Sequence, residues 1–184
     1  MPGLDFYDAG VLRQLATNLF YGWGYNFYRL ENQLRADDQL VRAKAGWLLG
    51  VAGASVQEAE SNYRREFLPA PSRAKPFPDA AAVAAAQQLE RLCKSISALA
   101  NRLAELPVPE NDRLTQRFRQ EAPTLAALIA QDEQLVGQCE LLRSTLEHRD
   151  GAWILESMPQ IQKGLEAIES TLLRRQALLL SKTT

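Results

Sequence analysis

The chain has 184 residues, 46% of them apolar and 23% charged, and its 21 basic and 22 acidic side chains leave a formal net charge of −1. This is the balance of an ordinary globular domain, and it lacks the basic excess that nucleic-acid-binding proteins usually carry. The most apolar stretch, residues 47–56, is shorter than the roughly 18 residues that a membrane span needs. The composition therefore argues against a nucleic-acid partner and against a membrane protein.

The first residues, Met-Pro-Gly-Leu-Asp, lack the basic region and apolar core of a secretory signal, so we expect a cytoplasmic protein. One histidine and two cysteines leave little material for a metal site or a nucleophile–base pair. The chain contains no Gly-rich phosphate loop, serine nucleophile elbow or zinc-ligand spacing. We expect no metal and no other cofactor, and the residue types argue against catalysis.

Residues 1–68 are predicted to form an aromatic-rich helical segment, the first part of a single helical-bundle domain over 1–184. Gly22 and Gly24 flank Trp23 in this segment. Each glycine inside a helix costs about 1 kcal/mol relative to alanine. We therefore expect a bend or a break of the helix at this point.

A second interruption is expected later in the same segment. Two glycines fall within residues 50–54, and residues 55–58, Ser-Val-Gln-Glu, have the pattern of a capping box. The pattern predicts that a new helix runs over about 56–67. Four prolines within residues 69–78 then predict an extended connector.

Residues 79–184 are predicted to form three long helices. The first, over 79–106, contains no glycine or proline; Asp79 is placed to cap its N-terminus and Pro107 to end it. Its large apolar residues alternate at spacings of three and four, as in the seam of a coiled coil. They are Leu89, Leu92, Ile96, Leu99, Leu103 and Leu106.

The second and third helices repeat this seam. The second follows Pro123 and is expected to close at Asp150, and the third is expected to begin or kink near Ser157 and to continue to about Leu180. Short connections favour antiparallel neighbours. Because no strand pattern occurs, the sequence predicts an all-α fold: an elongated antiparallel helical bundle of at least four helices with coiled-coil-like leucine seams.

Aromatic residues are concentrated at the start of the chain, where eight of the fourteen lie within the first 28 residues. Such side chains bury large areas, while Tyr and Trp also need partners for their polar ends. The simplest interpretation is that they fill the wider end of the bundle. A protein-binding surface and a small-molecule pocket are the two alternatives.

A polar stripe starts at Tyr28 and continues through Glu31, Arg35, Asp38 and Arg42 at spacings of three and four, which places it on one side of a helix. Each charge has an opposite charge one turn away. We expect the stripe to be a solvated face, because exposed charge pairs of this kind contribute little to stability. If another helix covers it, the stripe would instead fix the helix register or hold a polar ligand.

Two acidic residues stand where the seams call for apolar side chains. Asp37 falls between Leu34 and Val41, and Asp132 falls on the seam of the second long helix. A buried carboxylate must be paired, and arginine suits such pairing better than lysine. We interpret both as register-fixing or slightly exposed residues, with a ligand-binding or catalytic carboxylate as the alternative.

The remaining candidates have structural explanations. His148 lies at a helix end, where the helix dipole favours a cation. Cys93 and Cys139 lie on apolar faces and are predicted to be small buried hydrophobes. Two small basic groups stand in a chain without a basic excess and are expected to be solubilising, with RNA binding as the alternative. These groups are Arg113, Arg117 and Arg119, and Arg174 with Arg175.

Regular seams and few catalytic residue types favour a protein that works by presenting a surface. The sequence predicts an interaction or scaffold protein, with a protein partner or self-association expected. The alternative is a small-ligand-binding protein or enzyme with a pocket of N-terminal aromatics and nearby charges. The candidate partner- or ligand-binding residues are Trp23, Tyr25, Tyr28, Glu31, Arg35, Asp37, Asp38 and Arg42.

Overall fold

The computed structural model describes residues 5–22, 34–73, 76–106 and 122–180, with the side chains in these ranges except at 21–22, 34–37, 122–125 and 179–180. The regular structure in these ranges is all helical, which confirms the expected all-α class for this part of the chain. The described ranges contain six helices, which pack against one another. They are α1 (Ala9–Gly22), α2 (Leu34–Phe67), α3 (Ala80–Glu105), α5 (Ala122–Leu146), α6 (Gly151–Glu156) and α7 (Met158–Leu180).

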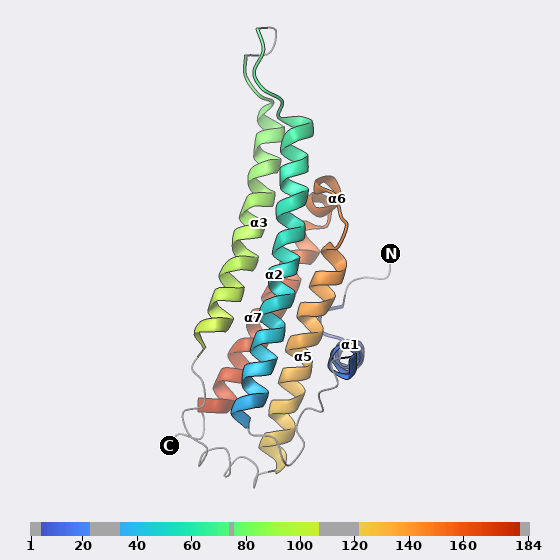
Figure 1. Cartoon of the computed structure of the whole chain (residues 1–184), viewed down its shortest axis with the longest axis vertical. Coiled ribbons are helices and arrows are strands. Elements are labelled where there is room, and N and C mark those ends of the chain that lie inside the picture. Colours follow the sequence, from blue (N-terminus) through green and yellow to red (C-terminus); the bar gives the residue numbers. More distant parts are fainter. Residues whose placement is uncertain (1–4, 23–33, 74–75, 107–121, 181–184) are drawn as a thin grey trace.

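Four long helices form the elongated body of the molecule (Figure 1). Helices α2 and α3 form one antiparallel hairpin, and α5 and α7 form a second with the short α6 at its turn. Because α2 packs against α5, the order around the body is α3, α2, α5, α7. Figure 1 shows that α2 and α5 run in the same direction. The expected antiparallel arrangement therefore holds within each hairpin but is wrong between the two hairpins.

The number of residues between α3 and α5 is large enough to allow this arrangement. The expectation assumed a tight turn after Pro107, whereas residues 106–121 separate the two helices. A chain of that length can reach about 50 Å when extended, which is enough to cross the end of a bundle. Helix α5 can therefore pack beside α2 instead of folding back on α3.

Helix α2 is continuous, so the expected interruption at residues 50–54 is wrong. Gly53 is buried at the contact with α3, where an added Cβ would lie 3.7 Å from Ile96 Cγ2. Ser55 does not cap a new helix, because its hydroxyl donates to the carbonyl of Val51 at 3.2 Å. Packing against α3 and α5 stabilises α2 by more than its glycines cost, as is usual for helices in proteins.

Helix α3 agrees closely with the sequence prediction. Asp79 is its N-cap, and the carboxylate accepts a hydrogen bond from the backbone N–H of Ala81 at 3.3 Å. The helix ends before Leu106, which is half-buried. The other seam residues are buried, namely Leu89, Leu92, Ile96, Leu99 and Leu103.

The turn after α5 differs from the prediction. Helix α5 ends at Leu146, and Asp150 caps α6 instead, accepting from the N–H of Trp153 at 2.8 Å. His148 makes the turn with a positive φ of 57°, a conformation that is uncommon for residues other than glycine. The expected break near Ser157 is confirmed, because this residue separates α6 from α7.

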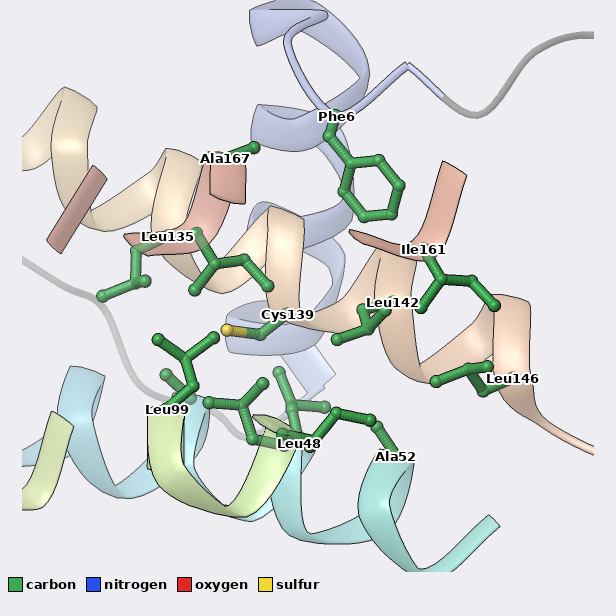
Figure 2. Packing of buried hydrophobic residues seen from close by; sticks show 14 of the residues in the cluster. Phe6, Leu48, Ala52, Leu99, Leu135, Cys139, Leu142, Leu146, Ile161 and Ala167 are labelled. Carbon is green, nitrogen blue, oxygen red and sulfur yellow. The ribbon is translucent and has the colours of Figure 1, made fainter. Parts of the chain in front are cut away.

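The core lies along the inner faces of the four long helices (Figure 2). Cys139 of α5 is fully buried within it, as expected, and Cys93 of α3 is half-buried. Both thiols are free. The residues around Cys139 in Figure 2 come from α2 (Leu48 and Ala52), α3 (Leu99), α5 (Leu135 and Leu142) and α7 (Ile161 and Ala167).

Helix α1 packs against α5 and is seen nearly end-on beside it in Figure 1. The two helices approach very closely at Gly137 of α5, where an added Cβ would lie 2.2 Å from the carbonyl oxygen of Leu12. Arg13 adds an ion pair, its Nε lying 2.9 Å from Glu133 Oε2. The absence of a side chain at Gly137 is therefore what allows α1 to rest on α5.

Phe6, just before α1, packs against α7. Its ring fills the space above Gly164, where an added Cβ would lie 2.6 Å from Phe6 Cζ, and Gln138 Nε2 donates to the Phe6 carbonyl at 2.9 Å. Phe6 and Phe20 are 2% and 8% exposed. The core-filling interpretation of the N-terminal aromatics is confirmed for these two residues, whereas Tyr7 is exposed.

Candidate functional site

The structure describes the side chains of two of the candidate residues, Asp38 and Arg42. The basic group at Arg113, Arg117 and Arg119 lies outside the described residues. The other candidates fall outside as well: Trp23, Tyr25, Tyr28 and Glu31 entirely, and Arg35 and Asp37 with their side chains.

Asp38 and Arg42 belong to a buried charge cluster, which we define as Asp38, Arg42, Asp132 and Arg175. Arg175 of α7 lies between the carboxylates of Asp38 on α2 and Asp132 on α5, and all three side chains are 2% exposed. Arg175 Nη1 is 2.8 Å from Asp38 Oδ1, and Arg175 Nε donates to Asp132 Oδ1. The cluster therefore joins three helices through one guanidinium.

Arg42 extends the cluster to the fourth long helix. Its Nη2 lies 3.0 Å from Asp38 Oδ2, and its Nη1 donates to the backbone carbonyl of Leu106, the C-cap of α3. The two oxygens of Asp38 thus face two different arginines. Two arginines and two aspartates also balance in charge, so the cluster is neutral as a whole.

The electrostatics of Arg175 show why its carboxylate partners matter. Burial by itself would lower the pKa of this guanidinium, because an apolar environment disfavours a cation. The charges of Asp132 and Asp38, together with the hydrogen bond to Asp132, outweigh burial and raise the pKa above its ordinary value. Arg175 therefore stays charged, and each buried charge depends on the others for its compensation.

Two expectations are corrected here. The polar stripe is not a solvated face at Asp38 or Arg42, whose side chains are 2% and 11% exposed, because the neighbouring long helices cover this side of α2. Arg175 is not solubilising, since it is buried in the bundle, whereas Arg174 is exposed as expected. Asp132 is buried and paired with Arg175, in agreement with the expectation that a buried carboxylate needs a partner such as arginine.

The sequence carried a signal for Arg175. It follows Ile168 and Leu172 at the seam spacing and precedes Leu179 by four residues, so it occupies a seam position just as Asp132 does on α5. An arginine and an aspartate that interrupt two seams are complementary. That complementarity could have predicted the contact between α5 and α7.

A second feature is a groove between α3 and α7. These helices contact each other less than the other neighbouring long helices do. Between them lie two adjoining hollows of about 310 and 370 Å³ that share Ser95, Gln162 and Leu165 as lining residues. We call this surface the α3/α7 groove. Leu92 and Leu99 belong to the predicted seam of α3, whereas the polar and charged residues of the groove flank the seams and could not be recognised as one surface from the sequence.

The floor of the α3/α7 groove is apolar. Leu92 and Leu99 contribute from α3, and Leu165 and Met158 from α7. The two α3 leucines are buried, whereas Leu165 and Met158 are half-buried. The groove therefore offers a shallow apolar contact rather than an enclosed chamber.

The rims of the α3/α7 groove carry opposite charges. Arg91 and Arg102 line the α3 side, and Glu166 and Glu169 line the α7 side. One ion pair, Arg102 Nη1 with Glu169 Oε1, crosses the groove, and these side chains are 50% and 46% exposed. The charged rims are thus open to solvent, unlike the buried charge cluster.

Comparison with protein families, with curated proteins and with solved structures gives no match for this chain. Within the described ranges, no group of three or more His, Cys, Asp or Glu residues is placed to hold a metal ion. None of the described helices is long and apolar enough to span a membrane. The buried charge cluster and the α3/α7 groove are therefore the two features of the described residues that point to a function.

Proposed function

We propose that this protein is an interaction protein that self-associates and uses the α3/α7 groove as its binding surface. The observation that carries the proposal is a contrast between two contact regions of the bundle. Where α2, α5 and α7 meet, the helices close around a neutral charge cluster, whereas between α3 and α7 apolar residues and opposite charges remain accessible. Such a surface is suited to contact with other helices.

The buried charge cluster supports this function by fixing the helices that carry the surface. A polar residue at a seam position can specify helix register, because other registers would leave it buried without a partner. Here Asp132 and Arg175 meet from α5 and α7, and Asp38 from α2. We propose that the cluster keeps α7, and with it one rim of the groove, in a single position.

The heptad spacing supports the same proposal. The apolar seam positions described on α5 are buried at Leu128, Leu135, Leu142 and Leu146. Seams of this kind hold helices side by side over long distances. A bundle built in this way presents long, nearly straight helix surfaces, which suit a scaffold.

The small-ligand alternative receives less support. It needs polar anchors that can face a ligand, and Asp38 and Arg42 are engaged in ion pairs inside the bundle. Its aromatic walls, Trp23, Tyr25 and Tyr28, lie outside the described residues. Interaction through an exposed helix surface is therefore the function that the described part of the chain favours.

Sedimentation velocity of the full-length protein over a wide range of concentrations tests the proposal. We expect the weight-average sedimentation coefficient to rise with concentration, since a surface of this size supports reversible association. A sedimentation coefficient that stays at the monomer value over the whole range would contradict the proposed function.

A further inference from the structure

We infer that the α3/α7 groove binds the same groove of a second copy of this chain, in a two-fold dimer in which α3 of each copy faces α7 of the other. This inference rests on the proposed function and specifies its partner and geometry. It is carried by the placement of charges on the two rims and by the direction in which the two helices run.

The charges select one of two possible two-fold arrangements. Helices α3 and α7 run in the same direction (Figure 1), and the α3 rim is basic while the α7 rim is acidic. A two-fold axis parallel to the helices places the basic rim of one copy opposite the acidic rim of the other. An axis perpendicular to the helices places like charges together, which is unfavourable.

The individual charges also match in height along the groove. Arg102, Glu166 and Glu169 line the same hollow. Rotation about the parallel axis, without a shift along it, therefore places Arg102 opposite the partner's Glu169 and within one helix turn of the partner's Glu166. Since Arg102 already contacts Glu169 of its own chain, the dimer would place it between two carboxylates. Arg175 has this same arrangement inside the bundle.

Apolar residues on the same face would be covered by this dimer. Leu173 is 49% exposed and continues the spacing of Glu166 and Glu169 along α7. Ala98 is exposed on the α3 side of the groove, and Leu165 is half-buried between the helices. Association would remove these side chains from water, which provides an attraction that does not depend on salt.

The dimensions of the face suit a reversible dimer. The lining residues of α3 extend from Gln88 to Arg102, a length of about 21 Å at 1.5 Å per residue. Two adjacent helices give a width of about 20 Å. A face of this size falls at the small end of specific protein interfaces, so we expect the dimer to dissociate on dilution.

Two charge reversals test the inference, Glu166→Arg and Arg102→Glu, with sedimentation equilibrium of the full-length protein as the readout. Each variant alone would place like charges opposite each other twice per dimer, and we expect self-association to weaken by about tenfold or more. In an equimolar mixture the two variants can form a mixed dimer with complementary charges at both of its rim contacts. At one contact the unchanged Arg102 of one chain meets the partner's Glu166. At the other contact the two substituted side chains, which are also opposite in charge, meet each other. Because Arg102→Glu also removes the ion pair with Glu169 of its own chain, we expect the mixture to associate much more tightly than either variant alone but to fall short of the wild-type affinity.

A matched control separates this effect from a change in net charge. Glu156→Arg reverses an exposed acidic residue of α6 outside the groove, and we expect it to leave the dissociation constant unchanged. Far-UV circular dichroism of all variants should match that of the wild type, since the substituted side chains are exposed or half-exposed.

The outcomes distinguish the inference from the proposed function. If the wild type associates but both reversals associate equally well, or the mixture stays as weak as each variant alone, then another surface or another orientation makes the contact, and the inference is wrong while the proposed function stands. If the wild type is monomeric at every concentration, the proposed self-association fails and the inference fails with it.

Discussion

Two arginine–carboxylate contacts on α7 differ greatly in their surroundings. Arg175 and Asp132 are each 2% exposed, whereas Arg102 and Glu169 are 50% and 46% exposed. Inside the bundle no water is available to replace a lost partner, so the inner pairing is obligatory for the fold. On the surface water and salt screen the charges, so the outer pair adds little stability and remains free to meet a further charge. The location of an ion pair therefore decides whether it holds the fold together or serves recognition.

The largest effect is expected from removing the central cation of the buried charge cluster. Arg175→Met leaves Asp132 buried without its arginine, and we expect a loss of about 3–5 kcal/mol in the free energy of unfolding. Urea denaturation followed by circular dichroism measures this loss. Arg174→Met, on the adjacent exposed residue, is the matched control and should change stability by no more than about 0.5 kcal/mol.

The double variant Asp132→Leu/Arg175→Met sharpens this test. It removes both charges and leaves Asp38 paired with Arg42, so we expect it to recover most of the stability that Arg175→Met loses. If the single and double variants are equally unstable, lost packing rather than unpaired charge explains the effect. Equal stability of Arg175→Met and wild type would contradict the obligatory role of the cluster.

A smaller loss in the free energy of unfolding is expected from a substitution without charge at the contact between α1 and α5. Gly137→Ala would place Cβ 2.2 Å from the Leu12 carbonyl oxygen, so α1 must move away from α5. We expect a loss of about 1–3 kcal/mol, the usual range for overpacking, measured by urea denaturation.

Gly50→Ala is the matched control for this substitution. Gly50 also lies inside a long helix, but it is exposed, and an added Cβ would meet no atom within 4 Å. This change should stabilise the protein by up to about 1 kcal/mol, because alanine favours the helix. A loss at Gly50 as large as that at Gly137 would show that α1 docking is not the cause.

The outer ion pair should contribute far less to stability. Arg102→Met removes the partner of Glu169, and we expect a change of at most about 1 kcal/mol in the free energy of unfolding, since both side chains stay hydrated. Urea denaturation in the monomeric concentration range measures it. A loss as large as that of Arg175→Met would remove the distinction between the two contacts.

The smallest effect concerns thiol reactivity. Burial raises the pKa of both thiols, and because a raised pKa means less thiolate at a given pH, both should react slowly at pH values below their raised pKa. Cys93 is half-buried and Cys139 fully buried. We expect Cys93 to react first with a thiol-specific reagent, and Cys139 to react only on unfolding, as measured by mass spectrometry. Equal reaction rates for Cys93 and Cys139 in the folded protein would contradict the full burial of Cys139.

Much of the fold could be predicted from the spacing of apolar residues. The cap at Asp79, the buried seam of α3 and the break at Ser157 all depend on neighbours in sequence, which a local pattern describes well. The continuity of α2 could not be predicted in this way, because packing along its whole length outweighs the local cost of glycine. The parallel contact of α2 with α5 likewise depends on packing between helices that are distant in sequence, which no local rule determines.

The sites were predicted less well than the helices. The need for an arginine beside Asp132 followed from the chemistry of buried carboxylates, but its identity as Arg175 depends on contacts between distant helices. Asp38, which the sequence places on a solvated stripe, is buried on the inner face of α2 together with Val41 and Ala45, because the exact register of an irregular helix cannot be read from its own sequence. Gly137 and Gly164 leave room for Leu12 and Phe6, and this requirement for glycine is visible only when those segments are packed against α5 and α7.

Hydroxyl-radical footprinting of the wild-type protein at increasing concentrations decides whether the α3/α7 groove is the interaction surface, because it reports which side chains become covered on association. We expect the labelling of Met158 and Leu165 in the α3/α7 groove, and of Leu173 on the same face of α7, to fall as concentration rises, while that of the highly exposed Phe77, outside the groove, stays constant. Protection that develops at Phe77 while the groove residues keep their monomer reactivity would contradict the assignment of the groove as the interaction surface.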